Sequence, residues 1–274
     1  MVWFFYILLI GCGYLIHFYS SEASVIYASA VDQLGFSGQT EIAWKTFIEK
    51  FTFNLYEGAS EKIFEIQALQ EAARVDMRYA TYLSITFLVL TFILLAFQVY
   101  MARKYNHKER IVFHMIIIAM ICLAIGITTP ILNLVAFKEI PVLGTVIFKY
   151  DSKSIIGVIL KLFASKNIFV GLLILLFSVI TPVVKSILSL TVYTTVNINI
   201  RRKSLNIIKL IGKWSMTDVF VVALLLAFFS LSIDKTTDAW LSHGLYFFSA
   251  YVILSIITGH MLLVSKWRKE DLQV

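Results

Sequence analysis

The sequence contains few charged residues, few prolines and only two cysteines. Asp, Glu, Lys and Arg together make up 15% of its 274 residues, whereas hydrophobic residues make up 59%. A soluble domain has no need of several apolar runs of about 20 residues, but a helix that crosses a bilayer does. Because lipid offers the backbone no hydrogen-bonding partners, each run must be a helix. The sequence therefore predicts an all-α integral membrane protein.

The missing residues and motifs exclude several kinds of site. Cys12 and Cys122 both fall inside apolar runs, so we expect small buried hydrophobes rather than a disulfide framework or a CxxC metal site. The sequence has no Walker motif, no Gly-rich phosphate loop and no nucleophile–base constellation. We therefore expect no enzymatic activity, no cofactor and no metal. The net charge of +7 is ascribed to basic residues retained on the cytoplasmic side of a membrane, not to nucleic-acid binding.

Hydropathy predicts six transmembrane helices, which are Val2–Tyr19, Tyr79–Tyr100, Val112–Val135, Ile168–Val192, Trp214–Ile233 and Leu245–Val264. Dense clusters of Lys and Arg follow the second, fourth and sixth spans, within Met101–Arg110, Arg201–Lys213 and Lys266–Lys269. All three clusters fall on one side of the membrane, so the positive-inside rule places both termini in the cytoplasm. Five lysines between the third and fourth spans favour the opposite orientation, but they are spread over a longer stretch.

The first span allows three interpretations. It has features of a secretory signal peptide with an A-x-A site at Ala28–Ala30, or of a lipoprotein signal in which Leu9–Cys12 forms the lipobox. Both signals normally need basic residues near the N-terminus, and no Lys or Arg precedes Lys45. We therefore favour an uncleaved anchor.

An acidic segment, residues 21–76, separates the first two spans and is expected to be extracytoplasmic. Apolar residues recur there with the i, i+3, i+4, i+7 spacing of an amphipathic helix, at Trp44, Phe47, Ile48, Phe51 and Leu55. A second helical pattern begins near Ile63 and runs into the second span. The segment is either a small helical hairpin that packs on its own membrane domain or a docking surface for an extracytoplasmic partner.

Three ionisable residues inside the predicted spans are candidates for function. Lys185, Asp218 and His260 all fall in the cytoplasmic third of the membrane, where an uncompensated charge is costly. A Lys185–Asp218 ion pair is therefore possible at this depth. Each residue also has a structural explanation: Asp218 fits a first-turn acid favoured by the helix dipole, Lys185 is long enough to snorkel, and His260 fits an interfacial histidine.

Two prolines lie beside hydroxyl groups within predicted spans. Pro182 follows Thr181, and Pro130 follows Thr129 and precedes Asn133. A proline inside a helix removes a backbone donor and frees the carbonyl four residues earlier, so we expect a kink at each position. Such kinks commonly border a cavity, although a kink that only improves packing is the alternative.

Three ordered segments resemble the paraquat-inducible protein A (PqiA) family. They are GITTPILNLV (Gly126–Val135), FSVITPVVKSILSL (Phe177–Leu190) and GKWSMTDVFVVALLLA (Gly212–Ala227), and the resemblance covers roughly residues 110–265. It implies a four-helix membrane domain, residues 106–274, preceded here by an N-terminal transmembrane hairpin, residues 1–105. The residues that fall on motif positions are Pro130, Pro182, Lys185, Lys213, Trp214, Ser215 and Asp218.

The resemblance also implies a role in lipid trafficking in the bacterial envelope. Members of the family work in the inner membrane with MCE-type proteins, which form tunnels across the periplasm. We therefore expect a groove between spans three to six that passes a lipid, with phospholipid favoured, to or from an MCE-type partner. In that scheme Lys213 and Ser215 join the charged layer, and Trp214 is an interface anchor. This chain lacks the zinc-ribbon cysteines and the second module of many relatives, so structural zinc is not expected. A second copy of this chain in a homodimer, or a paralogous chain, is expected to supply the second module.

Two other functions fit parts of the sequence. The chain is a non-transporting scaffold if the segment Glu22–Asp76 anchors the MCE-type partner and no lipid passes. It is a transmembrane electron carrier if two histidine pairs, His114 with His260 and His17 with His243, ligate haem.

Overall fold

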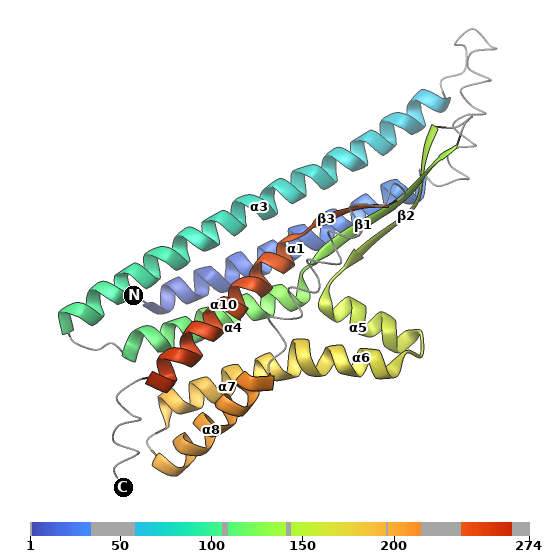
Figure 1. The fold of residues 1–274 in the computed structure, drawn as a ribbon. Helices are drawn as coiled ribbons and strands as arrows, with labels where there is room; N and C mark the ends of the chain where they lie inside the picture. The colour runs from blue at the N-terminus through green and yellow to red at the C-terminus, as the bar shows by residue number, and fades with distance from the viewer. Residues whose placement is uncertain are drawn as a thin grey trace.

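The computed structural model describes residues 2–33, 58–105, 109–140, 144–195, 197–214 and 237–264 (Figure 1). The helices are α1 (Val2–Gln33), α3 (Gly58–Tyr105), α4 (Glu109–Thr128), α5 (Ile155–Ala164), α6 (Ile168–Leu175), the π-helical turn η1 (Leu176–Ile180), α7 (Thr181–Thr194), α8 (Ile198–Trp214) and α10 (His243–Val264). The strands are β1 (Leu132–Ile140), β2 (Gly144–Lys153) and β3 (Thr237–Leu241).

Five helical segments in the described part of the chain are long and apolar enough to cross a membrane. They are Trp3–Gln33, Phe64–Lys104, Arg110–Thr128, Ile168–Thr194 and His243–Leu263. The chain is therefore a multi-pass helical membrane protein, as predicted. The predicted fifth span, Trp214–Ile233, lies outside the described residues except for Trp214 at the end of α8, so a sixth span stays a prediction.

Helices α1 and α3 lie side by side and form a long hairpin (Figure 1). The 48 residues of α3 extend for about 72 Å at 1.5 Å per residue, more than twice the ~30 Å hydrocarbon core. The predicted helix near Ile63 that runs into the second span is confirmed, and it begins at Gly58. The rings of Tyr19 and Tyr79 lie 5.5 Å apart, as in the aromatic belt where a span leaves the hydrocarbon. Both helices continue past this pair, while the predicted amphipathic helix at Trp44–Leu55 lies outside the described residues.

The third predicted span is wrong in its last part. Helix α4 ends at Thr128, and Leu132–Ile140 forms strand β1 instead of continuing the helix to Val135. The predicted kink at Pro130 is likewise wrong, because Pro130 follows the end of the helix. Proline has no N–H to donate and disfavours helical geometry at the residue before it, which is Thr129.

The chain continues from α4 into an antiparallel sheet with strand order β2-β1-β3, which the sequence analysis did not predict. Strand β1 pairs with β2 through a hairpin and with β3 from a distant part of the chain. The sheet lies against the distal part of α1, where Ser152 Oγ donates a hydrogen bond to Ser24 Oγ over 3.1 Å (Figure 1). The strands hydrogen-bond to one another, which satisfies the backbone groups of the chain after the end of α4 and before the start of α10.

Backbone hydrogen bonds join α4, the sheet and α10 at one junction. The N–H of Gly244 donates to Pro130 O over 2.8 Å, and the N–H of Ser242 donates to Ile131 O over 3.0 Å. A Cβ on Gly244 would collide with the carbonyl oxygens of Thr129 and Pro130. One on Gly126 would lie 2.7 Å from the backbone nitrogen of Phe248. Glycine at both positions thus allows the start of α10 to pack directly on the end of α4.

The described residues of the bundle form two hydrophobic clusters. The larger joins α1, α3, α4 and α10, and includes an edge-to-face contact between Phe87 and Phe247 with ring centroids 5.1 Å apart. The smaller lies at the end far from the sheet, where Ile208 of α8 packs with residues of α4, α7 and α10. Because residues of the N-terminal hairpin belong to the larger cluster, the hairpin shares its core with the rest of the bundle.

The junction predicts the effect of adding one methyl group. Gly244→Ala should destabilise the protein by about 1–3 kcal/mol, because backbone carbonyls cannot move aside as a flexible side chain would. Gly259→Ala is the matched control on the same helix, since a Cβ there meets nothing within 4 Å. Thermal unfolding of both variants in detergent micelles measures the difference. Equal unfolding midpoints would contradict the tight packing at this junction.

Candidate functional site

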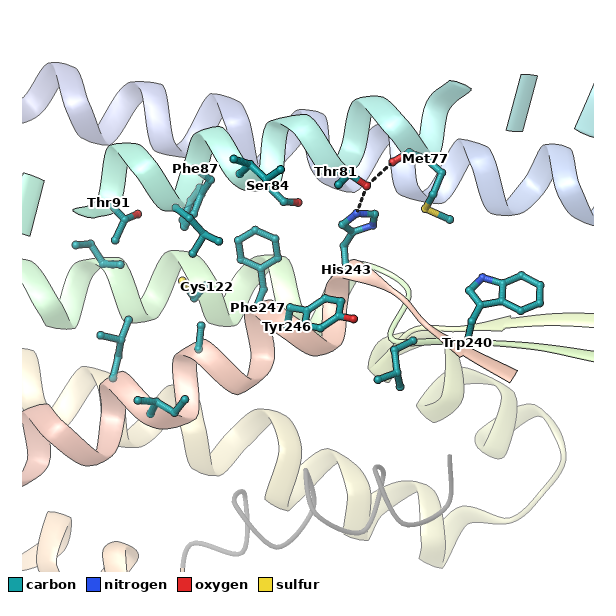
Figure 2. Close-up of a pocket in the computed structure, with 17 residues that line it drawn as sticks. Met77, Thr81, Ser84, Phe87, Thr91, Cys122, Trp240, His243, Tyr246 and Phe247 are labelled. Atoms are coloured by element: carbon teal, nitrogen blue, oxygen red, sulfur yellow. Dashed lines mark hydrogen bonds between the residues drawn. The ribbon is translucent and has the colours of Figure 1, made fainter. Parts of the chain in front are cut away.

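A groove of about 720 Å³ lies between α3 and α10. Helix α4 contributes Ile118 and Cys122 to its wall, and β3 contributes Trp240 and Leu241. Figure 2 shows Phe87 of α3 and Phe247 of α10 near the middle of the groove. The remaining lining residues are Met77, Thr81, Ser84, Ile85, Leu88, Thr91, His243, Tyr246, Ala250, Ile253 and Leu254. The volume falls in the range of ordinary ligand-binding sites.

The groove is apolar along most of its length and reaches the outer surface of the bundle. Ile85, Leu88 and Ile253 line it and are 53%, 60% and 58% exposed. They belong to membrane-spanning segments, so their exposed surface faces lipid rather than water. On α3 the lining runs from Met77 to Thr91, a rise of about 21 Å. The groove is therefore an elongated apolar slot that opens toward the bilayer.

Polar groups gather at the end of the groove nearest the sheet. His243 Nε2 lies 3.2 Å from Thr81 Oγ1, which itself donates to Met77 O over 2.9 Å (Figure 2). The nearby hydroxyl of Ser84 donates to Ala80 O over 2.8 Å. The Nδ1 atom of His243 is buried and finds no partner among the described residues. One end of the groove thus carries an unsatisfied hydrogen-bonding atom.

A second, polar cavity of about 410 Å³ lies between α1 and β2. Its lining is rich in hydroxyl groups, which come from Ser21, Ser24, Thr128, Tyr150, Ser152 and Ser154. Tyr150 donates to Asn133 Oδ1 over 3.2 Å, and burial raises the pKa of Tyr150 above its ordinary value, so the phenol stays protonated. The rings of Tyr27, Tyr150 and Trp240 contact one another beside this cavity. Because Trp240 lines the groove and Tyr150 lines the polar cavity, this aromatic cluster connects the two.

Two residues predicted to flank a kink belong to the junction instead. Thr129 and Asn133 are both fully buried, Thr129 just after the end of α4 and Asn133 on β1. Thr129 Oγ1 and Asn133 Nδ2 have no hydrogen-bond partner among the described residues. Neither residue lines the groove, and Pro130 lines only the polar cavity.

The predicted irregularity at Pro182 takes the form of a widened helical turn. The segment Leu176–Ile180 is π-helical, and the N–H of Thr181 donates to Leu176 O, five residues earlier. A turn of this kind accommodates a proline ring, which would clash with the carbonyl four residues before it in a regular α-helix. The Pro182 carbonyl accepts hydrogen bonds from Tyr251 Oη over 3.0 Å and from Ser186 Oγ over 2.9 Å. The sequence analysis did not identify Tyr251. The only indication of its role was that a phenol inside an apolar span needs a hydrogen-bond partner.

The predicted charged residues lie in different places. Lys185 is half-buried one turn beyond Pro182 on α7, and His260 is exposed on α10. Measured from the Pro182–Tyr251 contact, Lys185 lies about 5 Å along α7 and His260 about 14 Å along α10, a difference of about 9 Å, or fewer than two helical turns. Lys213 and Trp214 end α8, and nothing is described of their side chains. Ser215 and Asp218 lie outside the described residues, so the Lys185–Asp218 pair stays a prediction.

The histidines of the proposed haem pairs contact protein groups. His114 forms a hydrogen bond with Tyr6 and stacks on its ring, and His17 lies 3.5 Å from Ser21 Oγ. His243 contacts Thr81. Within the described ranges, no three His, Cys, Asp or Glu side chains are grouped to hold a metal ion.

The bond to the Pro182 carbonyl predicts a modest loss of stability in Tyr251→Phe. The change removes the buried hydroxyl but leaves Ser186 bonded to the same carbonyl, so the loss should be about 1 kcal/mol. Tyr14→Phe on the lipid-facing surface of α1 is the control and should be neutral. Thermal unfolding in detergent measures both variants. An unchanged unfolding midpoint in Tyr251→Phe would show that this bond does not hold α10 to α7.

Comparison with known families gives one match. Residues 117–269, more than half of the chain, match the family model described as paraquat-inducible protein A. The match includes the segments around Pro182 and Asp218. Comparisons with curated proteins and with solved structures give no significant match.

Proposed function

The chain belongs to the paraquat-inducible protein A family, and from this membership and its groove we propose that it is a lipid-transport component of the bacterial inner membrane. In this proposal it catalyses no reaction and passes a phospholipid to or from an MCE-type periplasmic partner. The observation that carries the proposal is the apolar slot between α3 and α10, which opens toward the bilayer and ends in polar groups. An amphiphile matches both its apolar length and its polar end.

The groove includes a helix that the sequence analysis had not assigned to it. The expected groove lay between spans three to six, whereas the described one uses α3, the second span, together with α4 and α10. A lipid that enters between α3 and α10 exchanges one apolar contact for another and need not cross water. The hairpin of α1 and α3 is therefore part of the transport unit in this proposal.

The distribution of basic residues supports an assignment of the polar end of the groove to one side of the membrane. Basic residues occupy the ends of helices far from the sheet: Arg103 and Lys104 end α3, Arg110 begins α4, and Arg201–Lys203 begin α8 (Figure 1). By the positive-inside rule this end is cytoplasmic, so the sheet and the projecting parts of α1 and α3 are periplasmic. A periplasmic partner then meets the polar end of the groove. Both termini are cytoplasmic in the same proposal.

The charged residues of the family motifs, Lys185 and Asp218, have a separate role in the proposal. Lys185 and Asp218 bind an anionic headgroup or change protonation during the transport cycle. ATP energy would come through another subunit, because the sequence has no nucleotide-binding loop. A homodimer would supply the second module that tandem relatives carry.

Blocking the groove tests the transport proposal. A photo-crosslinking residue at Phe247, which lines the groove and is only 5% exposed, should capture phospholipid that occupies the groove in native membranes. Ala250→Trp fills the groove from α10 and should reduce capture and envelope-barrier function by at least tenfold. Ile256→Trp places the same side chain at an exposed position of α10 outside the described groove lining and should change neither. Full function with a blocked groove would contradict the proposal.

Neutralising the motif charges tests the charged layer. Asp218→Asn and Lys185→Ala should each impair the envelope barrier in cells, while lipid capture at Phe247 persists in Lys185→Ala because Lys185 is not among the described residues that line the groove. Survival of cells on detergent measures the barrier, and immunoblotting of membranes controls for expression. Full barrier function in both variants would remove the charged layer from the mechanism.

A scaffold is the second candidate, favoured by the projecting hairpin and sheet. It predicts that substitutions within Glu22–Asp76 abolish function, whereas Ala250→Trp and the charge substitutions are tolerated. Exposed positions of α3 such as Glu71 and Arg74, which form an ion pair at 3.6 Å, suit such substitutions. The two sets of variants, compared in one barrier assay, separate the scaffold from the transporter.

A further inference from the structure

We infer that helix α8 is a binding surface for anionic phospholipids of the cytoplasmic leaflet. Arg202 and Lys209 meet the headgroups, and Ile207 and Leu210 meet the acyl chains. No described residue of the groove lining belongs to α8, so this binding does not depend on the proposed transport. The assignment to the cytoplasmic leaflet follows the proposed orientation of the chain.

The charge of α8 is of one sign. Its 17 residues include five Lys or Arg and no Asp or Glu. Arg201 turns back toward the protein, where its Nη2 donates a hydrogen bond to Thr195 O over 2.9 Å. Arg202, Lys203 and Lys209 are exposed. An exposed helix surface with charge of one sign attracts an oppositely charged partner, and anionic lipid is such a partner at a membrane.

The exposed surface of α8 is divided into a polar strip and an apolar strip. Arg202, Asn206 and Lys209 recur at i, i+4 and i+7, so they lie along one side of the helix, and all three are exposed. Ile207 and Leu210 are 42% and 60% exposed and lie on average about 100° around the helix from that side. A basic strip beside an apolar strip is typical of helices at the boundary between headgroups and acyl chains.

The buried side of α8 places this helix at the required depth. Ile208 packs with Val112, Val192 and Leu262 in the smaller hydrophobic cluster. Val112 is three residues from the start of α4, while Val192 and Leu262 are each two residues from the ends of α7 and α10. Ile208 thus contacts three neighbouring helices within about 5 Å of their ends. Figure 1 shows α8 at this end of the bundle, far from the sheet.

An anionic phospholipid matches both strips of α8 at once. Helices α7 and α10, on which α8 packs, belong to membrane-spanning segments, so acyl chains surround the bundle next to the apolar strip. An acidic protein segment would match the basic strip but would leave Ile207 and Leu210 without an apolar partner. Lys203 lies close to the apolar strip, where its four-carbon stem allows the ammonium group to reach the headgroups.

Competition between two lipids tests this surface on the full-length protein. The chain with a photo-crosslinking residue at Ile207 is placed in nanodiscs that contain equal amounts of dioleoyl phosphatidylglycerol and phosphatidylcholine. A basic residue near the membrane surface favours anionic lipid by about fivefold, so mass spectrometry should show phosphatidylglycerol at least fivefold over phosphatidylcholine in the crosslinked products. Salt at about 1 M should reduce this preference at least twofold, because it shortens the Debye length to about 3 Å.

Two double variants assign the preference to α8. Arg202→Gln with Lys209→Gln should reduce the preference below twofold, while capture continues because the apolar strip is intact. Arg103→Gln with Lys104→Gln is the matched control and should keep the full preference. It removes the same number of charges at the same end of the bundle, but from α3, which lies across α4 and α10 from α8 (Figure 1). All four positions are exposed, so both variants should fold.

Four results would overturn the inference. Equal capture of both lipids by the unsubstituted protein is the first, and an unchanged preference in Arg202→Gln with Lys209→Gln is the second. Equal loss of preference in the α3 control is the third, because the preference would then come from the general charge at this end of the bundle. Ala250→Trp fills the groove and should leave the preference at Ile207 unchanged. Loss of the preference in Ala250→Trp is the fourth, since the captured lipid would then come from the groove. Failure of the transport proposal alone leaves the preference at Ile207 in place.

Discussion

The structure depends on the backbone junction at which α4, β1 and α10 meet. Inside a bilayer every backbone N–H and C=O must find a partner, so a chain cannot leave a helix there without another donor to meet the freed carbonyls. Gly244 provides that donor to Pro130, and the strands supply the rest. The absence of a side chain on Gly244 makes this approach possible. These bonds thereby fix the position of the start of α10 relative to the end of α4 and to the sheet.

This junction also places the groove. His243 precedes Gly244, so the bonds that hold the start of α10 hold His243 opposite Thr81 as well. Tyr251 bonds to the Pro182 carbonyl two turns further along α10, which ties the same helix to α7. With α10 held on α4 and α7, the slot between α10 and α3 keeps its apolar lining open to lipid. The proposed transport function follows from this fixed α10 and from the polar atoms at one end.

The sequence predicted the features that depend on local hydropathy and motif order. Membrane-spanning helices in α1, α3, α4, α6–α7 and α10 followed from apolar runs. At Pro182 the sequence predicted a kink, and the structure has a widened π-helical turn just before the proline. The strand at Leu132–Ile140 did not follow, because its first half is as apolar as a span and its partner β3 lies about a hundred residues away. Hydropathy cannot distinguish such a strand from a helix. His243 and Thr81 were likewise not paired from the sequence, since their contact depends on how α3 and α10 pack.

The central claim is that the slot between α3 and α10 holds a lipid. Cryo-electron microscopy of the full-length protein in nanodiscs made from native membrane lipid tests it most directly. The account predicts elongated density along Leu88 and Ile253, with the wider headgroup density at His243. A groove closed by direct packing of α3 on α10, or density only on the outer surface of the bundle, would contradict it.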